Sequence, residues 1–133
     1  MADIDWLAEQ AWLRLKGGDG YTAYDGTVPS TPVGAYAVFY PVAGVFSQGR
    51  HGGGQYGYMW GFRVVCAGSS RAQTLGTVKR VRQRFLNYQL DPSPGSSPLR
   101  EDDVVAPLLR DDSVPSDIRF SQTLFYTLSY DRS

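Results

Sequence analysis

The sequence predicts an α+β fold: a mostly antiparallel sheet of about four to five strands with two helices packed on one face. Two segments carry apolar residues at helical spacing, and several others alternate apolar and polar residues as strands do. These segments are interleaved along the chain, which favours a layer of helices on a sheet. The length of 133 residues is typical of one domain, so we expect a single domain over residues 1–133.

The first predicted helix spans about Asp3 to Lys16. Asp3 can cap its N-terminus, and Gly17 follows its basic C-terminal end. The apolar residues are three or four positions apart, so they share one face of the helix. This face comprises Ile4, Leu7, Ala8, Ala11, Trp12 and Leu15.

Residues 17–32 are rich in Gly, Pro, Asp and Thr, which predicts a loop with a short extended piece near Tyr21–Tyr24. The alternation in Tyr36–Val42 then predicts a strand. Pro41 has no amide hydrogen to donate, so this strand should lie at an edge or end there.

Another strand is predicted after a Gly-rich excursion over residues 45–57. From Tyr56 to Cys66, every second residue is aromatic or aliphatic, so these side chains share one face. Gly57 and Gly61 belong to the opposite face, where a missing side chain lets another backbone approach closely.

The second predicted helix runs from about Ser70 to Tyr88, with Ser69 or Ser70 as its N-cap. Its expected buried face comprises Leu75, Val78, Val81, Phe85 and Leu86.

Residues 91–117 are predicted to form a long loop, because they are rich in Pro, Ser and Asp around one short apolar stretch at 104–109. The last segment, Arg119–Tyr130, alternates over its whole length. It predicts a long strand that needs a partner on each side. One row of this strand comprises Phe120, Gln122, Leu124, Tyr126, Leu128 and Tyr130.

Charge is segregated along the chain, although 13 basic and 13 acidic residues leave no net charge. Residues 26–90 contain no Asp or Glu and sum to +7, whereas residues 1–25 sum to −3 and residues 91–133 to −4. Opposite surfaces of two copies can attract each other, which favours head-to-tail association. The alternative is that the segments interleave in the folded chain.

Composition argues against several classes of function. One cysteine, Cys66, and one histidine, His51, are too few for a Cys/His zinc site or an intrachain disulfide. His51 begins an HGGG sequence similar to the oxyanion loop of some esterases, but the sequence has no G-x-S-x-G nucleophile motif. We expect a protein that is not an enzyme, needs no cofactor or metal, and uses Cys66 as a small core residue. No apolar run of about 20 residues is present, so we expect no membrane partner.

Two groups of charged residues are candidate binding surfaces. The pairs Asp102–Asp103 and Asp111–Asp112 are adjacent in sequence, so the side chains of each pair point apart and favour a solvated acidic loop over a shared-proton site. The basic residues of the segment 70–88, including Arg80 and Arg84, suit a small nucleic-acid-binding module. However, they are scattered around the helix, and the chain is not net basic.

The order of elements resembles the tail terminator family of long-tailed bacteriophages, which acts in tail completion and tail-to-head joining. The segment IDWLAEQAWLRLKG leads into Gly-rich loops and aromatic strands. The segment GFRVVCAGSSRAQTLGTVKRVRQRFLNYQL joins a strand to a basic helix, and RFSQTLFYTLSYDRS ends on a long strand. The resemblance covers nearly the whole chain, and the long Pro/Ser-rich loop at 91–99 departs from it. The family has no catalytic residues to transfer.

The resemblance implies a structural virion protein at the tail–neck junction, assembled in the host cytoplasm. It implies a homo-oligomeric ring, commonly a hexamer, that caps the tail tube, ends its polymerisation and faces a neck or head-completion protein. DNA would pass through the lumen without specific binding. The alternatives are a head-completion or stopper protein of the same virion, and a nucleic-acid-binding module using residues 70–88. Candidate interface or lumen residues are Arg50, His51, Tyr56, Arg80, Arg84, Asp102, Asp103, Asp111 and Asp112.

Overall fold

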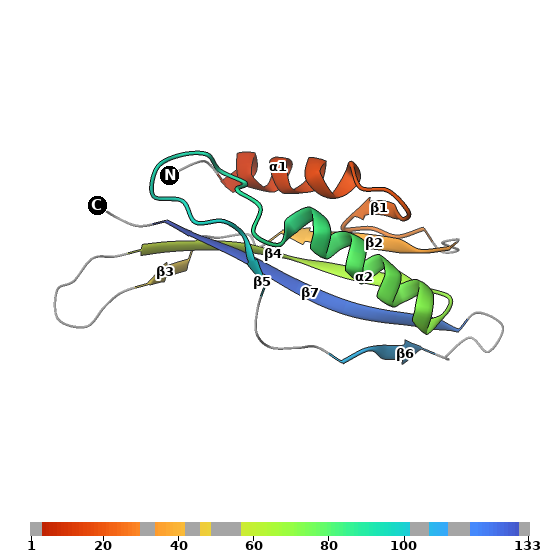
Figure 1. Ribbon diagram of the computed structural model, residues 1–133. Coiled ribbons are helices and arrows are strands. Elements are labelled where there is room, and N and C mark those ends of the chain that lie inside the picture. Colours follow the sequence, from red (N-terminus) through yellow and green to blue (C-terminus); the bar gives the residue numbers. More distant parts are fainter. Residues whose placement is uncertain are drawn as a thin grey trace.

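The computed structural model describes residues 4–29, 34–41, 46–48, 57–101, 107–111 and 118–130. Two helices, α1 (Ile4–Lys16) and α2 (Arg71–Phe85), lie on the same face of one mostly antiparallel sheet (Figure 1). The predicted α+β class is therefore confirmed.

The centre of the sheet is a long antiparallel pair. Strands β4 (Gly57–Gly68) and β7 (Arg119–Tyr130) are in register from the pair Tyr58–Tyr130 to the pair Gly68–Phe120. The alternation over residues 56–66 and 119–130 predicted both strands. In this pair the even-numbered residues face the helices, and the odd-numbered residues face the other way.

Shorter strands extend the sheet on both sides of this pair. On the free side of β4, two strands pair with successive parts of its edge, and β1 runs parallel to β2. On the free side of β7, two more strands pair with separate parts of its edge. The described sheet is thus seven strands that occupy five positions across it, in the order β1-β2-β4-β7-β5. The flanking strands are β1 (Thr22–Asp25), β2 (Tyr36–Pro41), β3 (Phe46–Gln48), β5 (Arg100–Glu101) and β6 (Leu109–Asp111).

The core lies between the helix layer and the sheet. The predicted apolar face of α1 packs inward, with Leu7, Ala11 and Leu15 fully buried. The helix-facing row of β4 is also buried from Trp60 to Cys66, as its alternation predicted. Together with residues of β2, α2 and β7, these side chains form one cluster that includes Phe39, Trp60, Phe62, Val64, Cys66, Phe85, Leu124, Tyr126 and Leu128.

The buried face of α2 differs in part from the prediction. Val78, Val81 and Phe85 are buried, but Leu75 and Leu86 are 44% and 47% exposed. Thr74 and Thr77 take inward positions instead, because their hydroxyl groups donate to the carbonyl oxygens of residues four positions earlier and so carry no unpaired polar atom into the core. The helix begins after the N-cap Ser70 and ends at Phe85, three residues before the predicted end.

The predicted loops also contain short strands. Residues 91–117 hold β5 and β6, and the excursion over residues 45–57 holds β3. Each of these strands has two or three residues. Such strands are too short to show an alternation, and they form because the long β4 and β7 offer unpaired edges.

At Gly61 the backbone of the neighbouring strand β7 approaches closely, as the sequence predicted. An added Cβ atom would lie 2.7 Å from the main-chain oxygen of Tyr126 on β7.

We expect Gly61→Ala to lower the free energy of unfolding by about 1–3 kcal/mol, because the two central strands must move apart. Gly76 is the matched control, since a Cβ there meets nothing within 4 Å. Gly76→Ala should stabilise α2 by about 0.5–1 kcal/mol. Urea denaturation of both variants measures the two changes, and equal destabilisation by both would contradict this prediction.

Candidate functional site

Three of the nine predicted interface residues fall within the described part of the chain. Arg80 and Arg84 are on α2, whereas Asp111 ends β6 at the edge of the sheet. The structure therefore does not bring these three residues into one cluster. The other six lie outside the described residues: Arg50, His51, Tyr56, Asp102, Asp103 and Asp112.

Arg84 joins the two helices through a reciprocal contact with Arg14. The Nε and Nη2 atoms of Arg84 donate to the main-chain oxygen of Arg14, at 3.1 and 3.0 Å. The Nε atom of Arg14 in turn donates to the main-chain oxygen of Arg84, at 2.9 Å. Each oxygen lies in the last turn of its helix, where carbonyl groups lack partners within the helix and the helix dipole is negative. Each arginine therefore caps the other helix.

The turn after α1 is shaped around these basic side chains. A Cβ on Gly17 would lie 2.8 Å from the Nη2 atom of Arg84, and one on Gly20, at φ +87°, would lie 2.6 Å from the guanidinium carbon of Arg80. Tyr21 completes the cap by donating its hydroxyl hydrogen to the main-chain oxygen of Leu15, at 2.7 Å. Burial raises the pKa of Tyr21 to about 12, so its hydroxyl group stays protonated as a donor.

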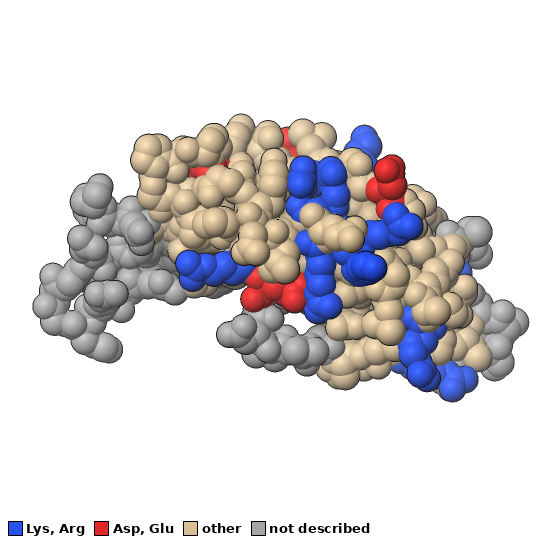
Figure 2. Space-filling model, in the orientation of Figure 1, with Lys and Arg blue, Asp and Glu red and all other residues tan. Residues whose placement is uncertain are grey.

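Lys and Arg side chains gather over α2 and the adjacent end of α1 (Figure 2). This basic surface comprises Arg14, Lys16, Lys79, Arg80, Arg82 and Arg84. Part of its charge is engaged within the molecule, because Arg14 and Arg84 bind carbonyl groups and Arg82 forms an ion pair with Glu101, at 2.9 Å.

We expect Arg84→Ala to lower the free energy of unfolding by about 1–3 kcal/mol, since it removes two charge-assisted hydrogen bonds and the cap of α1. The matched control is Arg71→Ala in the first turn of α2, where the side chain is exposed. That change should alter stability by less than about 0.5 kcal/mol. Thermal denaturation of the two variants at equal ionic strength measures the difference. Equal stability of the two variants would contradict a capping role for Arg84.

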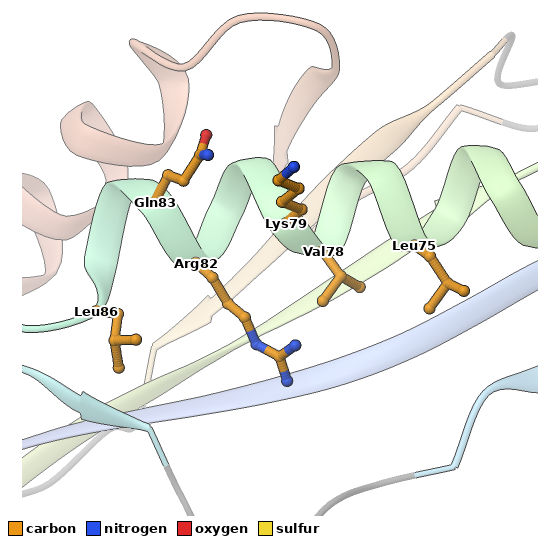
Figure 3. A pocket seen from close by; sticks show the side chains of 6 residues that line it. All are labelled: Leu75, Val78, Lys79, Arg82, Gln83 and Leu86. Carbon is orange, nitrogen blue, oxygen red and sulfur yellow. The ribbon is translucent and has the colours of Figure 1, made fainter.

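A groove of about 580 Å³ runs along the outer flank of α2. The exposed Leu75 and Leu86 stand at its two ends. Leu75, Val78, Arg82 and Leu86 extend from one side of the helix, over β7 (Figure 3). The residues that the sequence placed wrongly in the core therefore form the apolar ends of this groove.

A cluster of three hydrogen-bonded side chains, Arg82, Glu101 and Tyr126, lies where α2, β5 and β7 meet. Glu101 accepts hydrogen bonds from Arg82 and from the hydroxyl group of the fully buried Tyr126, at 2.9 Å. Burial of Tyr126, together with the adjacent carboxylate, raises the pKa of its hydroxyl group far above the ordinary value. Tyr126 is therefore a permanent donor, and the cluster fixes β5 against β7. The hydroxyl group of a buried tyrosine needs a hydrogen-bond acceptor, but the sequence does not show that Glu101 is this acceptor.

The sheet face opposite the helices, which we call the open face, is covered by neither helix nor strand among the described residues (Figure 1). By register it carries the odd-numbered residues of β4 and β7 and the even-numbered residues of β2. The guanidinium group of Arg63 lies 4.8 Å from the ring centre of Tyr40, and that of Arg119 lies 5.9 Å from the ring centre of Tyr36. Phe125, on the same face, is 39% exposed.

The described residues contain no group of three or more His, Cys, Asp or Glu side chains that could hold a metal ion. Cys66 is fully buried on the helix-facing row of β4, where burial raises the pKa of its thiol to about 12. A thiol in this state is a poor nucleophile at neutral pH, in agreement with a core role. No described helix is both long and apolar enough to span a bilayer.

In its described parts the molecule is a two-layer α+β protein, with a basic surface over α2 and the adjacent end of α1, a groove along α2, and an open face that carries aromatic and basic residues. The sequence matches no family model and no curated protein. Its structure is similar to a chain in a solved structure described as the virion of a native gene transfer agent particle. The TM-score is 0.53 with 12% sequence identity, and the match covers 95% of this chain and 92% of the other. The two chains therefore share this fold.

Proposed function

We propose that this chain is a structural protein of a phage-like virion and that it caps the end of the tail tube as a ring. The observation that carries the proposal is the similarity to a chain of a virion particle, which extends over 95% of this chain. The order of elements, which resembles the tail terminator family, supports the more specific role. In this role the chain stops polymerisation of the tube and presents a surface to the neck.

The surfaces of the described residues support assembly with copies of itself. The helices and the open face lie on opposite sides of the sheet, so the chain presents two unlike surfaces (Figure 1). A contact between two unlike surfaces repeats from copy to copy, and it closes into a ring when the rotation per copy divides a full turn. We propose a hexamer, with DNA passing through its lumen without specific binding.

The contacts of the basic surface favour this role over a nucleic-acid-binding module. Arg82 is paired with Glu101, and the guanidinium groups of Arg14 and Arg84 are engaged with carbonyl oxygens. The ion pair therefore reduces the net charge that Arg82 adds to this surface, and Arg14 and Arg84 have part of their donor capacity occupied. Both effects lower the electrostatic attraction to a phosphate backbone, which is the main source of non-specific affinity for DNA.

Tail assembly in vitro tests the proposed function. The chain is added to the polymerising tail tube protein of its own particle, and tube lengths are measured by negative-stain electron microscopy. We expect shorter tubes with a ring at one end, and rings that sediment with tubes. Unchanged tube lengths together with binding to filled heads would favour the head-completion or stopper role. Salt-dependent binding of labelled DNA, with no binding to tubes or heads, would favour the nucleic-acid-binding module.

A further inference from the structure

We infer that the open face of the sheet in one copy receives the outer face of α1 from the next copy, and that this contact builds the ring. The inference rests on the proposed function for the existence of a ring. It adds which two surfaces of the chain meet and which residues determine the contact.

The outer face of α1 combines apolar and acidic residues. Trp6 and Leu13 are 41% and 48% exposed, although both are large and apolar. At 100° per residue, Trp6, Glu9 and Leu13 fall within an arc of about 60° on the side of the helix away from the core. Glu9 is exposed and has no ion-pair partner among the described residues. Lys16 carries the opposite charge and stands at the far end of the helix.

The open face combines apolar and basic residues. Phe125 and Leu109 are 39% and 59% exposed, and register places both on this face. The exposed Arg63 lies directly opposite Phe125 on the neighbouring strand, and its guanidinium group rests on Tyr40. Register also places Arg100 and Arg119 here. Among the described residues of this face, the acidic one is Asp111, at the edge opposite Arg119.

Charge complementarity selects a head-to-tail contact. An open face against a second open face would bring together two surfaces on which Arg63, Arg100 and Arg119 outnumber Asp111 among the described residues. Two outer faces of α1 packed symmetrically about Glu9 would likewise bring Glu9 against Glu9. Like charges placed together in an interface are unfavourable, whereas Glu9 against Arg63 is attractive. The remaining contact would join exposed aromatic and aliphatic groups, which are typical of the centre of protein interfaces.

The placement of the two surfaces makes this contact repeat. The outer face of α1 and the open face lie on opposite sides of the molecule, with the helix layer and the sheet between them (Figure 1). Each copy can therefore donate one surface and receive the other at the same time. In a two-fold dimer both copies use the same surface, so assembly stops at two copies. In the head-to-tail contact, one outer face of α1 and one open face stay unoccupied at the ends until a ring closes.

A charge exchange tests the pairing of Glu9 with Arg63. We expect Glu9→Arg and Arg63→Glu each to weaken self-association about tenfold or more, because each places like charges in the contact. The double variant Glu9→Arg/Arg63→Glu should recover most of the loss, since it restores attraction with the signs exchanged. Light scattering over a concentration series measures the association. The matched control is Arg71→Glu, which reverses an exposed charge outside both surfaces. A double variant that is as weak as the sum of the single losses would overturn the inference.

Cross-linking gives a second test that does not depend on charge. The variant Leu13→Cys/Phe125→Cys is treated with a short bis-maleimide, with the chain alone and with the chain bound to tail tubes. The native Cys66 is fully buried and should not react. We expect a ladder of covalent oligomers on a denaturing gel, and dimers when the two single-cysteine variants are mixed. The control Leu75→Cys/Phe125→Cys, which uses a similarly exposed leucine on α2, should give no ladder.

The outcomes separate this inference from the proposed function. Rings that still form and cap tubes, while the Leu13→Cys/Phe125→Cys variant gives no covalent ladder in either condition, would overturn the inferred contact and leave the function standing. A ladder and a restored double charge variant, with no effect of the wild-type chain on tail tubes, would support the contact and contradict the function.

Discussion

Replacing Phe62 with alanine is expected to lower the free energy of unfolding by about 3–5 kcal/mol. Phe62 is fully buried on β4, and its ring centre lies 5.0–5.6 Å from four other aromatic rings. These rings belong to β2, β4, α2 and β7, so the cavity would open where both layers meet. The four neighbours are Phe39, Trp60, Phe85 and Tyr126.

Phe125→Ala is the matched control for this prediction. It deletes the same side chain from the open face, where the ring is 39% exposed, and should cost the monomer less than about 1 kcal/mol. Both variants are compared by urea denaturation at a protein concentration low enough to keep the chain monomeric. A loss below about 1.5 kcal/mol for Phe62→Ala would contradict the central role of this ring in the core.

The second large effect is expected at Asp91, an acidic residue that is only 1% exposed. One of its carboxylate oxygens accepts a hydrogen bond from the hydroxyl group of Tyr130, at 2.5 Å, and the other accepts from the main-chain nitrogen of Ser93, at 2.9 Å. Asp91→Ala should cost about 2–4 kcal/mol, because it leaves two donors without their charged acceptor. Asp91→Asn keeps the size and one acceptor oxygen, so it should cost less.

The same site predicts a dependence of stability on pH. Burial alone would raise the pKa of Asp91, but hydrogen bonds from Tyr130 and from the side chain and main chain of Ser93 outweigh it, and the pKa is lowered. A carboxyl group with a lowered pKa in the folded state contributes stability above its unfolded pKa of about 3.9, and that contribution is lost as the pH falls through the folded value. The difference in unfolding free energy between the wild type and Asp91→Asn should therefore have its full size at pH 6–7, which is about two pH units or more above the unfolded pKa. It should shrink below about pH 4. A difference that does not change with pH would contradict this assignment.

Much of the fold could be predicted from the sequence because its largest elements are periodic. The apolar stripe of α1 and the alternation of β4 and β7 each continue over many residues, and one buried face explains each pattern. The buried face of α2 was predicted less accurately. Its pattern placed Leu75 and Leu86 inward, but Thr74 and Thr77 can be buried because their hydroxyl groups bind the helix's own carbonyl oxygens.

The candidate site was less predictable, since it depends on contacts between distant segments. Arg84 could be recognised as a basic residue of a helix, but its contact with Arg14 joins residues 70 positions apart. The short β5 carries no periodicity, so the sequence did not indicate that Glu101 would face Arg82 and Tyr126. The open face was partly visible in the sequence, because Arg63 and Phe125 belong to the rows opposite the buried ones.

The reciprocal caps formed by Arg14 and Arg84 also affect how the molecule responds to acid. Both donors are guanidinium groups, which stay charged at all ordinary pH values, and both acceptors are main-chain carbonyl groups, which do not titrate. The junction between the helices therefore contains no group that a change of pH can switch off. Asp91, by contrast, is an acceptor with a lowered pKa that acid protonates, and it holds Tyr130 of β7. Acid should therefore first loosen the contact between Asp91 and Tyr130, while the two helices remain joined.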